Sequence, residues 1–154
     1  MANHLCRIMC CPLKHDMERA LIKDMDVLGK ILLVDDDMGI REVLSEVLSG
    51  EGFEVKVAKD GLESLDELER DNFDLVIIDI NMPRLDGISM LRVMERAGRK
   101  EKVIIMSGTT LDRDVMDRGL PDIVDRLYKP FNINKFLDVV ANALSHQQDP
   151  ETRM

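Results

Sequence analysis

The residues in this sequence that are best suited to chemistry are acidic, and they stand where apolar runs end. Asp35, Asp36 and Asp37 directly follow the run ILLV, and Asp79 directly follows LVII. Carboxylates gathered at one place repel one another, which raises some of their pKa values unless a cation lies among them. Hard oxygen ligands of this kind suit Mg²⁺, which accepts a few carboxylates and keeps waters for a phosphate ligand. The acidic residues therefore predict a Mg²⁺ site.

Two further residues at the ends of apolar runs suit an anion with several oxygens. Ser107 ends the run KVIIMS, and Lys129 follows DIVDRLY. A carboxylate can attack phosphorus to form an acyl phosphate, and a metal, a lysine and a hydroxyl around the phosphoryl oxygens would supply most of the catalysis. Asp79 is the candidate nucleophile in this interpretation.

Elements of regular structure must bring these residues together. The apolar runs predict strands over 30–34, 53–58, 74–79, 102–107 and 122–128. Helical periodicity between and after the strands predicts five helices: one over 38–52, one that follows the strand at 53–58, one over 87–98, one near 111–118 and one over 132–147. The first helix is expected to present an apolar face made of Ile40, Val43, Leu44, Val47 and Leu48. The second is expected to carry Leu62, Leu65 and Leu68, and the last Ile133, Phe136, Leu137, Val140 and Leu144.

Alternation of strands and helices predicts an α/β fold with a doubly wound, five-stranded parallel sheet, because parallel neighbours need crossover connections that are usually helical. In such a sheet, ligands bind outside the carboxyl ends of the strands. The candidate site residues are therefore expected at one rim.

Composition narrows the function. The 154 residues suit one domain, and 45% of them are hydrophobic, as in a globular chain. Aromatic residues make up 3%, and the net charge is −9 without any run of Lys or Arg, which argues against nucleic acid as a partner. The sequence lacks a membrane-length apolar stretch and a signal peptide, so we expect a soluble cytoplasmic protein with no membrane partner.

Four motifs, ILLVDDD, DLVIIDINMPRLDG, VIIMSG and YKPF, together resemble the receiver domains of two-component response regulators. That family carries an acidic pair after its first strand, an Asp after the third, a Ser or Thr after the fourth and Lys-Pro after the fifth. The resemblance covers residues 30 to 147 and implies a flavodoxin-like strand order of 2-1-3-4-5.

The resemblance implies roles for the acidic residues. Asp79 would accept a phosphoryl group from a phosphohistidine on a histidine kinase or a histidine phosphotransfer protein, in a Mg²⁺-dependent reaction. Asp36 and Asp79 would bind Mg²⁺ directly, the backbone carbonyl of Asn81 would complete the protein ligands, and Asp35 would act through water.

It also implies roles at the fourth and fifth strands. Ser107 and Lys129 would hold phosphoryl oxygens, and the peptide bond before Pro130 is often cis in the family. One position departs from the family pattern: many receivers place a Tyr or Phe three residues before the lysine, where this chain has Arg126. We hypothesise that Arg126 takes the place of this aromatic switch by pairing differently before and after phosphorylation.

The expected output is protein binding or onward phosphorelay by a stand-alone, chemotaxis-type receiver, and not enzymatic turnover. Its kinase, its downstream partner and its oligomeric state stay open. A phosphatase with an aspartate nucleophile is the alternative class. Such enzymes carry DxDxT after the first strand, where this chain reads DDDMG.

Simpler structural roles compete for several residues. Asp79 could cap the turn before Pro83, although this would not explain the polar residues at the other strand ends. Asp37 is expected to be the N-cap of the first helix and not a metal ligand. Met90, Met94, Met106 and Met116 are expected to fill the core.

We expect residues 1–29 to form an N-terminal extension, part helical or disordered, before a domain at 30–147 and a frayed tail at 148–154. Cys6, Cys10 and Cys11 lie there with His4 and His15, in no recognised zinc spacing. Three interpretations remain: a metal site, an internal translation start at Met17 or Met25, and an amphipathic helix. The helix would place Met17, Leu21, Met25 and Leu28 on one face, packed on the domain or on a partner.

Overall fold

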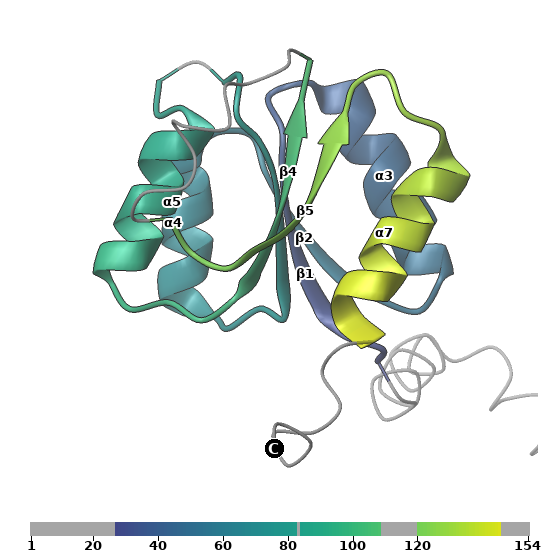
Figure 1. The fold of residues 1–154 in the computed structure, drawn as a ribbon, viewed down its shortest axis with the longest axis horizontal. Helices are drawn as coiled ribbons and strands as arrows, with labels where there is room; N and C mark the ends of the chain where they lie inside the picture. The colour runs from purple at the N-terminus through teal and green to yellow at the C-terminus, as the bar shows by residue number, and fades with distance from the viewer. Residues whose placement is uncertain (1–26, 83, 109–119, 146–154) are drawn as a thin grey trace, which may run out of the picture.

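A computed structural model describes residues 27–82, 84–108 and 120–145, and Figure 1 shows that they form a sheet between two layers of helices. The five strands are parallel and lie in the order β2-β1-β3-β4-β5. They span Lys30–Val34 (β1), Glu54–Ala58 (β2), Leu75–Asp79 (β3), Lys102–Ser107 (β4) and Ile123–Tyr128 (β5). The predicted fold class and strand order are confirmed.

Four helices lie in the described part of the chain. Helices α3 (Met38–Gly50) and α7 (Ile133–Ser145) cover one face of the sheet, and α4 (Gly61–Arg70) and α5 (Gly87–Arg96) cover the other (Figure 1). The helix predicted near 111–118 lies outside the described residues, as do residues 1–26 and 146–154. Among the helices that are described, none has the length and hydrophobicity that a membrane span requires.

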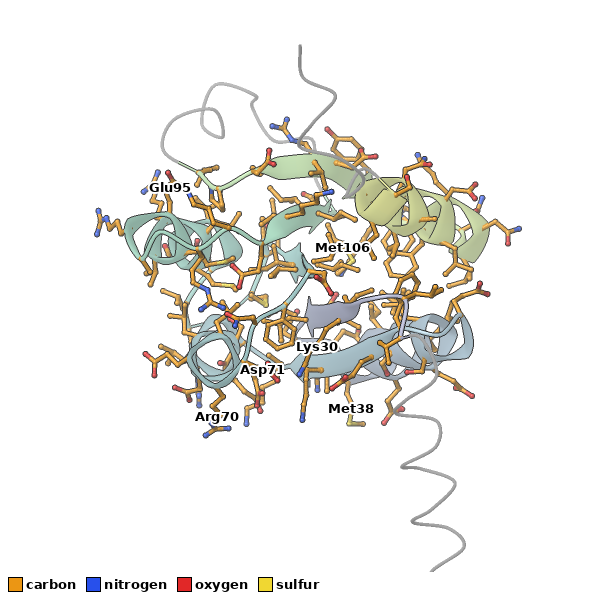
Figure 2. The ribbon with its side chains drawn as sticks, turned by 90° about the horizontal axis from the view of Figure 1, so that it is seen from below. Lys30, Met38, Arg70, Asp71, Glu95 and Met106 are labelled. Atoms are coloured by element: carbon orange, nitrogen blue, oxygen red, sulfur yellow. The ribbon has the colours of Figure 1, made fainter. Side chains whose placement is uncertain are left out.

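Side chains of the central strands alternate between two hydrophobic cores. On β1, Leu32 and Val34 pack into the core beneath α4 and α5, whereas Ile31 and Leu33 pack into the core beneath α3 and α7. All four are fully buried. Burial on both faces explains why these strands read as continuous apolar runs in the sequence. Figure 2 shows Met106 inside the layers, as predicted for the core methionines.

Aspartates begin three of the helices. The side chains of Asp37, Asp60 and Asp86 each accept a hydrogen bond from the backbone amide three residues further along, at 3.1, 2.8 and 2.8 Å. Such N-caps satisfy donors that the first helical turn leaves without a partner. The predicted cap role of Asp37 is confirmed. Glycines with positive φ, Gly52 and Gly98, follow the ends of α3 and α5.

Some predicted details are wrong. Val43 and Leu62 belong to the apolar patterns of their helices, yet each is 52% exposed. The periodicity of the sequence marks a broad apolar stripe along a helix, and only the part of that stripe that faces the sheet is buried. The second strand begins at Glu54 and not at Phe53. It lies at the edge of the sheet, as the predicted order requires, and Val57 is 43% exposed. Val27 and Leu28, which the amphipathic-helix interpretation of the extension includes, are not helical.

Gly87 begins α5 directly against the end of β3. A Cβ at this position would lie 2.7 Å from Cα of Ile80 and 2.8 Å from the carbonyl oxygen of Asp79, so Gly87→Ala must displace the backbone that carries Asp79. We expect this variant to lower the free energy of unfolding by about 1–3 kcal/mol, measured by urea denaturation.

Gly50→Ala is the matched control, because a Cβ at Gly50 would meet nothing within 4 Å. Its stability is expected to stay within about 0.5 kcal/mol of the wild type. An equal loss in both variants would show that the close approach at Gly87 is not the cause.

Candidate functional site

The carboxyl ends of β1, β3, β4 and β5 form one rim of the sheet. In the register, Asp79 pairs with Met106 and Ser107 pairs with Tyr128, so Lys129 follows at the same level. This parallel register explains how residues far apart in the sequence reach one place. Strand β2 lies at the edge of the sheet, next to β1 alone.

Three carboxylates gather at this rim. Asp35, Asp36 and Asp79 each offer an oxygen, and these oxygens lie within 4.8 Å of one another. Asp35 and Asp79 are buried, with 0% and 5% of their surface exposed, whereas Asp36 is exposed. Burying two carboxylates side by side is costly unless a positive charge is near.

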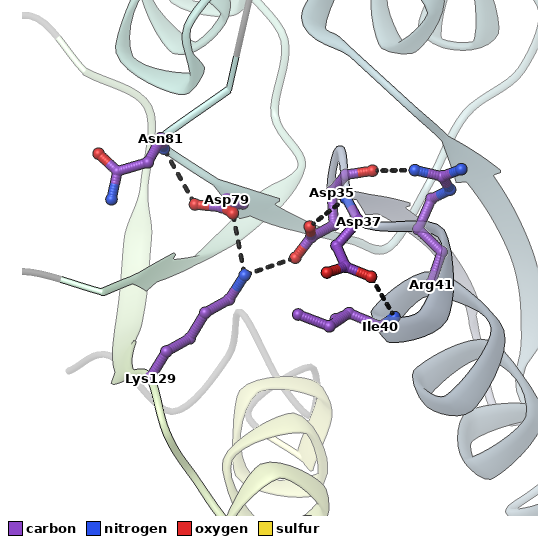
Figure 3. Close-up of polar contacts among 7 residues, drawn as sticks. All are labelled: Asp35, Asp37, Ile40, Arg41, Asp79, Asn81 and Lys129. Atoms are coloured by element: carbon purple, nitrogen blue, oxygen red, sulfur yellow. Dashed lines mark hydrogen bonds and ion pairs between the residues drawn. The ribbon is translucent and has the colours of Figure 1, made fainter.

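Lys129 supplies that charge. Its ammonium donates hydrogen bonds to Oδ2 of Asp35 at 2.7 Å and to Oδ2 of Asp79 at 2.9 Å (Figure 3). The backbone amide of Lys129 donates to the carbonyl oxygen of Ser107 at 2.7 Å, and the bond between Lys129 and Pro130 is cis. One side chain from the end of β5 therefore joins the ends of β1 and β3.

Backbone amides hold the other carboxylate oxygens. Oδ1 of Asp35 accepts from the amide of Asp37, and Oδ1 of Asp79 accepts from the amide of Asn81, both at 2.9 Å (Figure 3). The Arg41 guanidinium donates to the carbonyl oxygen of Asp35 at 2.5 Å. Asp35 and Asp79 thus have the same arrangement: one oxygen bonds to an amide and the other to the shared lysine.

Burial and charge shift two pKa values in the cluster. Burial raises the pKa of Asp35, and the hydrogen bonds from Lys129 and the Asp37 amide only partly oppose this. For Lys129, burial alone would lower the pKa, but the hydrogen bonds to Asp35 and Asp79 outweigh it and the pKa is raised. The balance differs because one lysine faces two carboxylates, so each carboxylate receives only part of its charge.

The residues fit a divalent cation. Oxygens bound to one Mg²⁺ are at most about 4.2 Å apart, so the three carboxylates need only a small adjustment to share an ion. Three carboxylates against one ammonium leave two negative charges, which Mg²⁺ would neutralise. All the donors are hard oxygens, as Mg²⁺ prefers.

Two other predicted site residues, Ser107 and Asn81, also lie at this rim. Ser107 is 3% exposed at the end of β4, and Asn81 is exposed just after β3. Arg126 is half-buried on β5, paired in register with Ile105. Sequence reasoning missed Arg41, since its position one turn into α3 does not reveal that its side chain turns back toward Asp35.

The raised pKa of Asp35 predicts how Asp35→Asn changes stability with pH when no divalent cation is present. Because the pKa in the folded protein lies above the ordinary 3.8, the stability contributed by this group is present below that pH and lost as the pH rises through the folded pKa. Asparagine does not ionise, so we expect the variant to gain stability relative to the wild type as the pH is raised from about 3 to about 7.

Urea unfolding at the two pH values measures this gain. Asp36→Asn is the matched control, because Asp36 is an exposed neighbour of the same type. If Asp36→Asn gained as much unfolding free energy between the two pH values as Asp35→Asn, burial of Asp35 would not be the cause.

Comparisons with known proteins agree with this geometry. Residues 31–141 match the response regulator receiver domain family. The sporulation initiation phosphotransferase F of Bacillus subtilis is 35% identical over 115 residues, which cover 75% of this chain and 93% of that protein. The CpxR homolog of Haemophilus influenzae, a transcriptional regulatory protein, is 33% identical, but the match covers 82% of this chain and only 55% of the relative. The chain therefore spans nearly all of one relative and about half of the other.

Solved structures show the same fold. The receiver domain of the Francisella response regulator 1452 has a TM-score of 0.69 and 32% identity, covering 77% of this chain and 98% of that one. The response regulator TrrA from Thermotoga maritima, in complex with Mg²⁺-BeF, has a TM-score of 0.65 and 32% identity, covering 74% of this chain and 97% of that one. With its acidic rim and shared lysine in the family's order, this chain belongs to the response regulator receiver domains.

Proposed function

We propose that this chain accepts a phosphoryl group on Asp79, in a Mg²⁺-dependent reaction, from a phosphohistidine on a histidine kinase or phosphotransfer protein in the cytoplasm. The observation that carries the proposal is the ammonium of Lys129 between Asp35 and Asp79, at a rim where three carboxylates converge. The family match and the Mg²⁺-bound relative support the same chemistry.

The geometry suits Asp79 as the nucleophile. Its carboxylate is oriented by the Asn81 amide on one oxygen and by Lys129 on the other, and each oxygen keeps a lone pair. Attack by a carboxylate oxygen on phosphorus would form the acyl phosphate bond while the phosphorus–nitrogen bond breaks and its electron pair returns to the imidazole. Only the phosphoryl group moves between the proteins.

The neighbours of Asp79 would stabilise the transferring group. In the proposed arrangement Asp36, Asp79 and the Asn81 carbonyl would hold Mg²⁺ directly, with Asp35 acting through water. A bound Mg²⁺ would supply positive charge to the phosphoryl oxygens. Lys129 would donate its ammonium to one of those oxygens and Ser107 its hydroxyl to another, which favours the charge that spreads over them in the transition state.

The output that we propose is phosphorylation-dependent protein binding or onward relay by this domain. Added charge at Asp79 would shift a two-state equilibrium in the surface near β4 and β5. Arg126, half-buried on β5 three residues before Lys129, is where we expect the readout to differ from receivers with an aromatic residue there.

Labelling with phosphoramidate in the presence of Mg²⁺ tests the phosphoacceptor. We expect the wild type to gain the mass of one phosphoryl group, since Asp79 is the oriented carboxylate of the site, and Asp79→Asn to gain none, as measured by intact-mass spectrometry. Asp37→Asn is the matched control: it lies at the same rim, and Asn still caps a helix.

Loss of labelling in Asp37→Asn but not in Asp79→Asn would overturn the assignment. Steady release of inorganic phosphate from many phosphomonoesters would instead indicate a phosphatase.

Thermal unfolding tests the Mg²⁺ site. An ion that binds only the folded protein at ten times its Kd stabilises by about 1.4 kcal/mol, which raises Tm by roughly 3–6 °C for a chain of this size. We expect millimolar Mg²⁺ to produce such a rise, and we expect Asp36→Asn to reduce it.

Asp66→Asn provides the control, because Asp66 is an aspartate on α4, outside the cluster. A wild type whose Tm does not respond to Mg²⁺ would count against the site.

A further inference from the structure

An apolar groove of about 700 Å³ lies beside the acidic site, between the first turns of α3 and α7. Its apolar walls are Ile40, Val43, Leu44, Pro130, Phe131 and Ile133, and Asp37 and Lys129 also line it. Val43 leaves 52% of its surface exposed there, although it belongs to the apolar pattern of α3. A contiguous exposed apolar surface of this kind usually marks a binding site.

The chain enters the domain at the other end of the same two helices. The amide of Leu28 donates to the carbonyl oxygen of Gly52, just beyond the end of α3, at 3.2 Å. A Cβ on Gly29 would lie 3.6 Å from the side chain of Leu144, in the last turn of α7. Leu28 is itself 62% exposed. The segment before Val27 therefore begins near the C-terminal ends of α3 and α7, whereas the groove lies between the N-terminal ends of the same two helices.

The preceding segment has the length and the pattern to reach the groove. Helix α3 has 13 residues and is about 20 Å long, and residues 1–26 precede Val27. Ten residues in a helix span about 15 Å, and an extended stretch of equal length spans about 33 Å. Met17, Leu21 and Met25 recur every fourth residue, which places them on one face of a helix.

We propose that residues 17–26 lie along α3 and cover this groove with Met17, Leu21 and Met25. Residues 17–26 are joined directly to the domain at Val27, and such a short connection gives a segment an effective concentration of about the millimolar range at the groove. This favours the segment over a second copy or a separate protein. The inference goes beyond the proposed function. A segment in this position would lie next to Lys129, which also lines the groove.

Disulfide trapping in the full chain tests the proposal. In a background where Cys6, Cys10 and Cys11 are replaced by Ser, Leu21→Cys is combined with Val43→Cys in the groove. The matched control combines Leu21→Cys with Leu62→Cys, because Leu62 is also 52% exposed but lies on α4, across the sheet. With oxidised glutathione as oxidant, one thiolate forms a mixed disulfide and the second thiol displaces glutathione to close the bond.

We expect the intramolecular disulfide with residue 43 to form at least about tenfold faster than that with residue 62, measured by intact mass and non-reducing gels at low protein concentration. Equal rates would overturn the proposal. Covalent dimers would indicate that a second copy of the chain occupies the groove. Failure of both pairs to form a disulfide would indicate a separate partner. Both outcomes also overturn the proposal.

A second pair of variants separates docking from random collision. Adding Met17→Ser and Met25→Ser to the first pair should abolish the rate advantage, because the apolar stripe is lost. Adding Arg19→Ser and Lys23→Ser, on the opposite face of the same helix, should preserve it. A rate advantage that survives the first change would contradict docking through this stripe. Urea midpoints of all variants establish that each one folds.

Discussion

The ammonium of Lys129, shared between Asp35 and Asp79, is the interaction on which the rim of this sheet depends. Two buried carboxylates and an exposed third lie within 4.8 Å of one another, and their mutual repulsion is strong where water is excluded. Lys129 offsets it by joining β5 to β1 and β3, two strands that are not its neighbours in the sheet. The same contact gives Asp79 a fixed orientation, which a nucleophile needs.

The site is nevertheless left with a deficit of positive charge. The cluster has three carboxylates and one lysine, and burial still raises the pKa of Asp35. A site of this kind gains stability from a divalent cation and from any change that redistributes the lysine's hydrogen bonds. This links the chemistry proposed for Asp79 to a change in the surrounding structure, since any phosphoryl oxygen that engages Lys129 competes with Asp35 for the same ammonium. The apolar groove that Lys129 also lines lies next to the site of that change.

Much of this architecture was predictable from the sequence. Strands buried on both faces give continuous apolar runs, and the carboxyl ends of parallel strands share one rim, so the polar residues that follow the runs were expected to converge. The strand order was predicted from the family resemblance and not from the residues alone. The exposure of Val43 and Leu62 could not be predicted, because periodicity does not show how much of a helix stripe its neighbours cover. The hydrogen bond from Arg41 to the carbonyl oxygen of Asp35 could not be predicted either, because it depends on a side-chain rotamer that packing selects.

The measurement that tests the shared lysine most directly is the effect of Asp35→Asn in two backgrounds, the wild type and Lys129→Met, by urea unfolding without divalent cations. Removing the lysine leaves Asp35 and Asp79 buried without a counter-charge. Neutralising Asp35 should then raise the free energy of unfolding by more than it does in the wild type. We predict that Asp35→Asn stabilises the Lys129→Met variant by at least about 1 kcal/mol more than it stabilises the wild type. Equal effects in the two backgrounds would contradict the account.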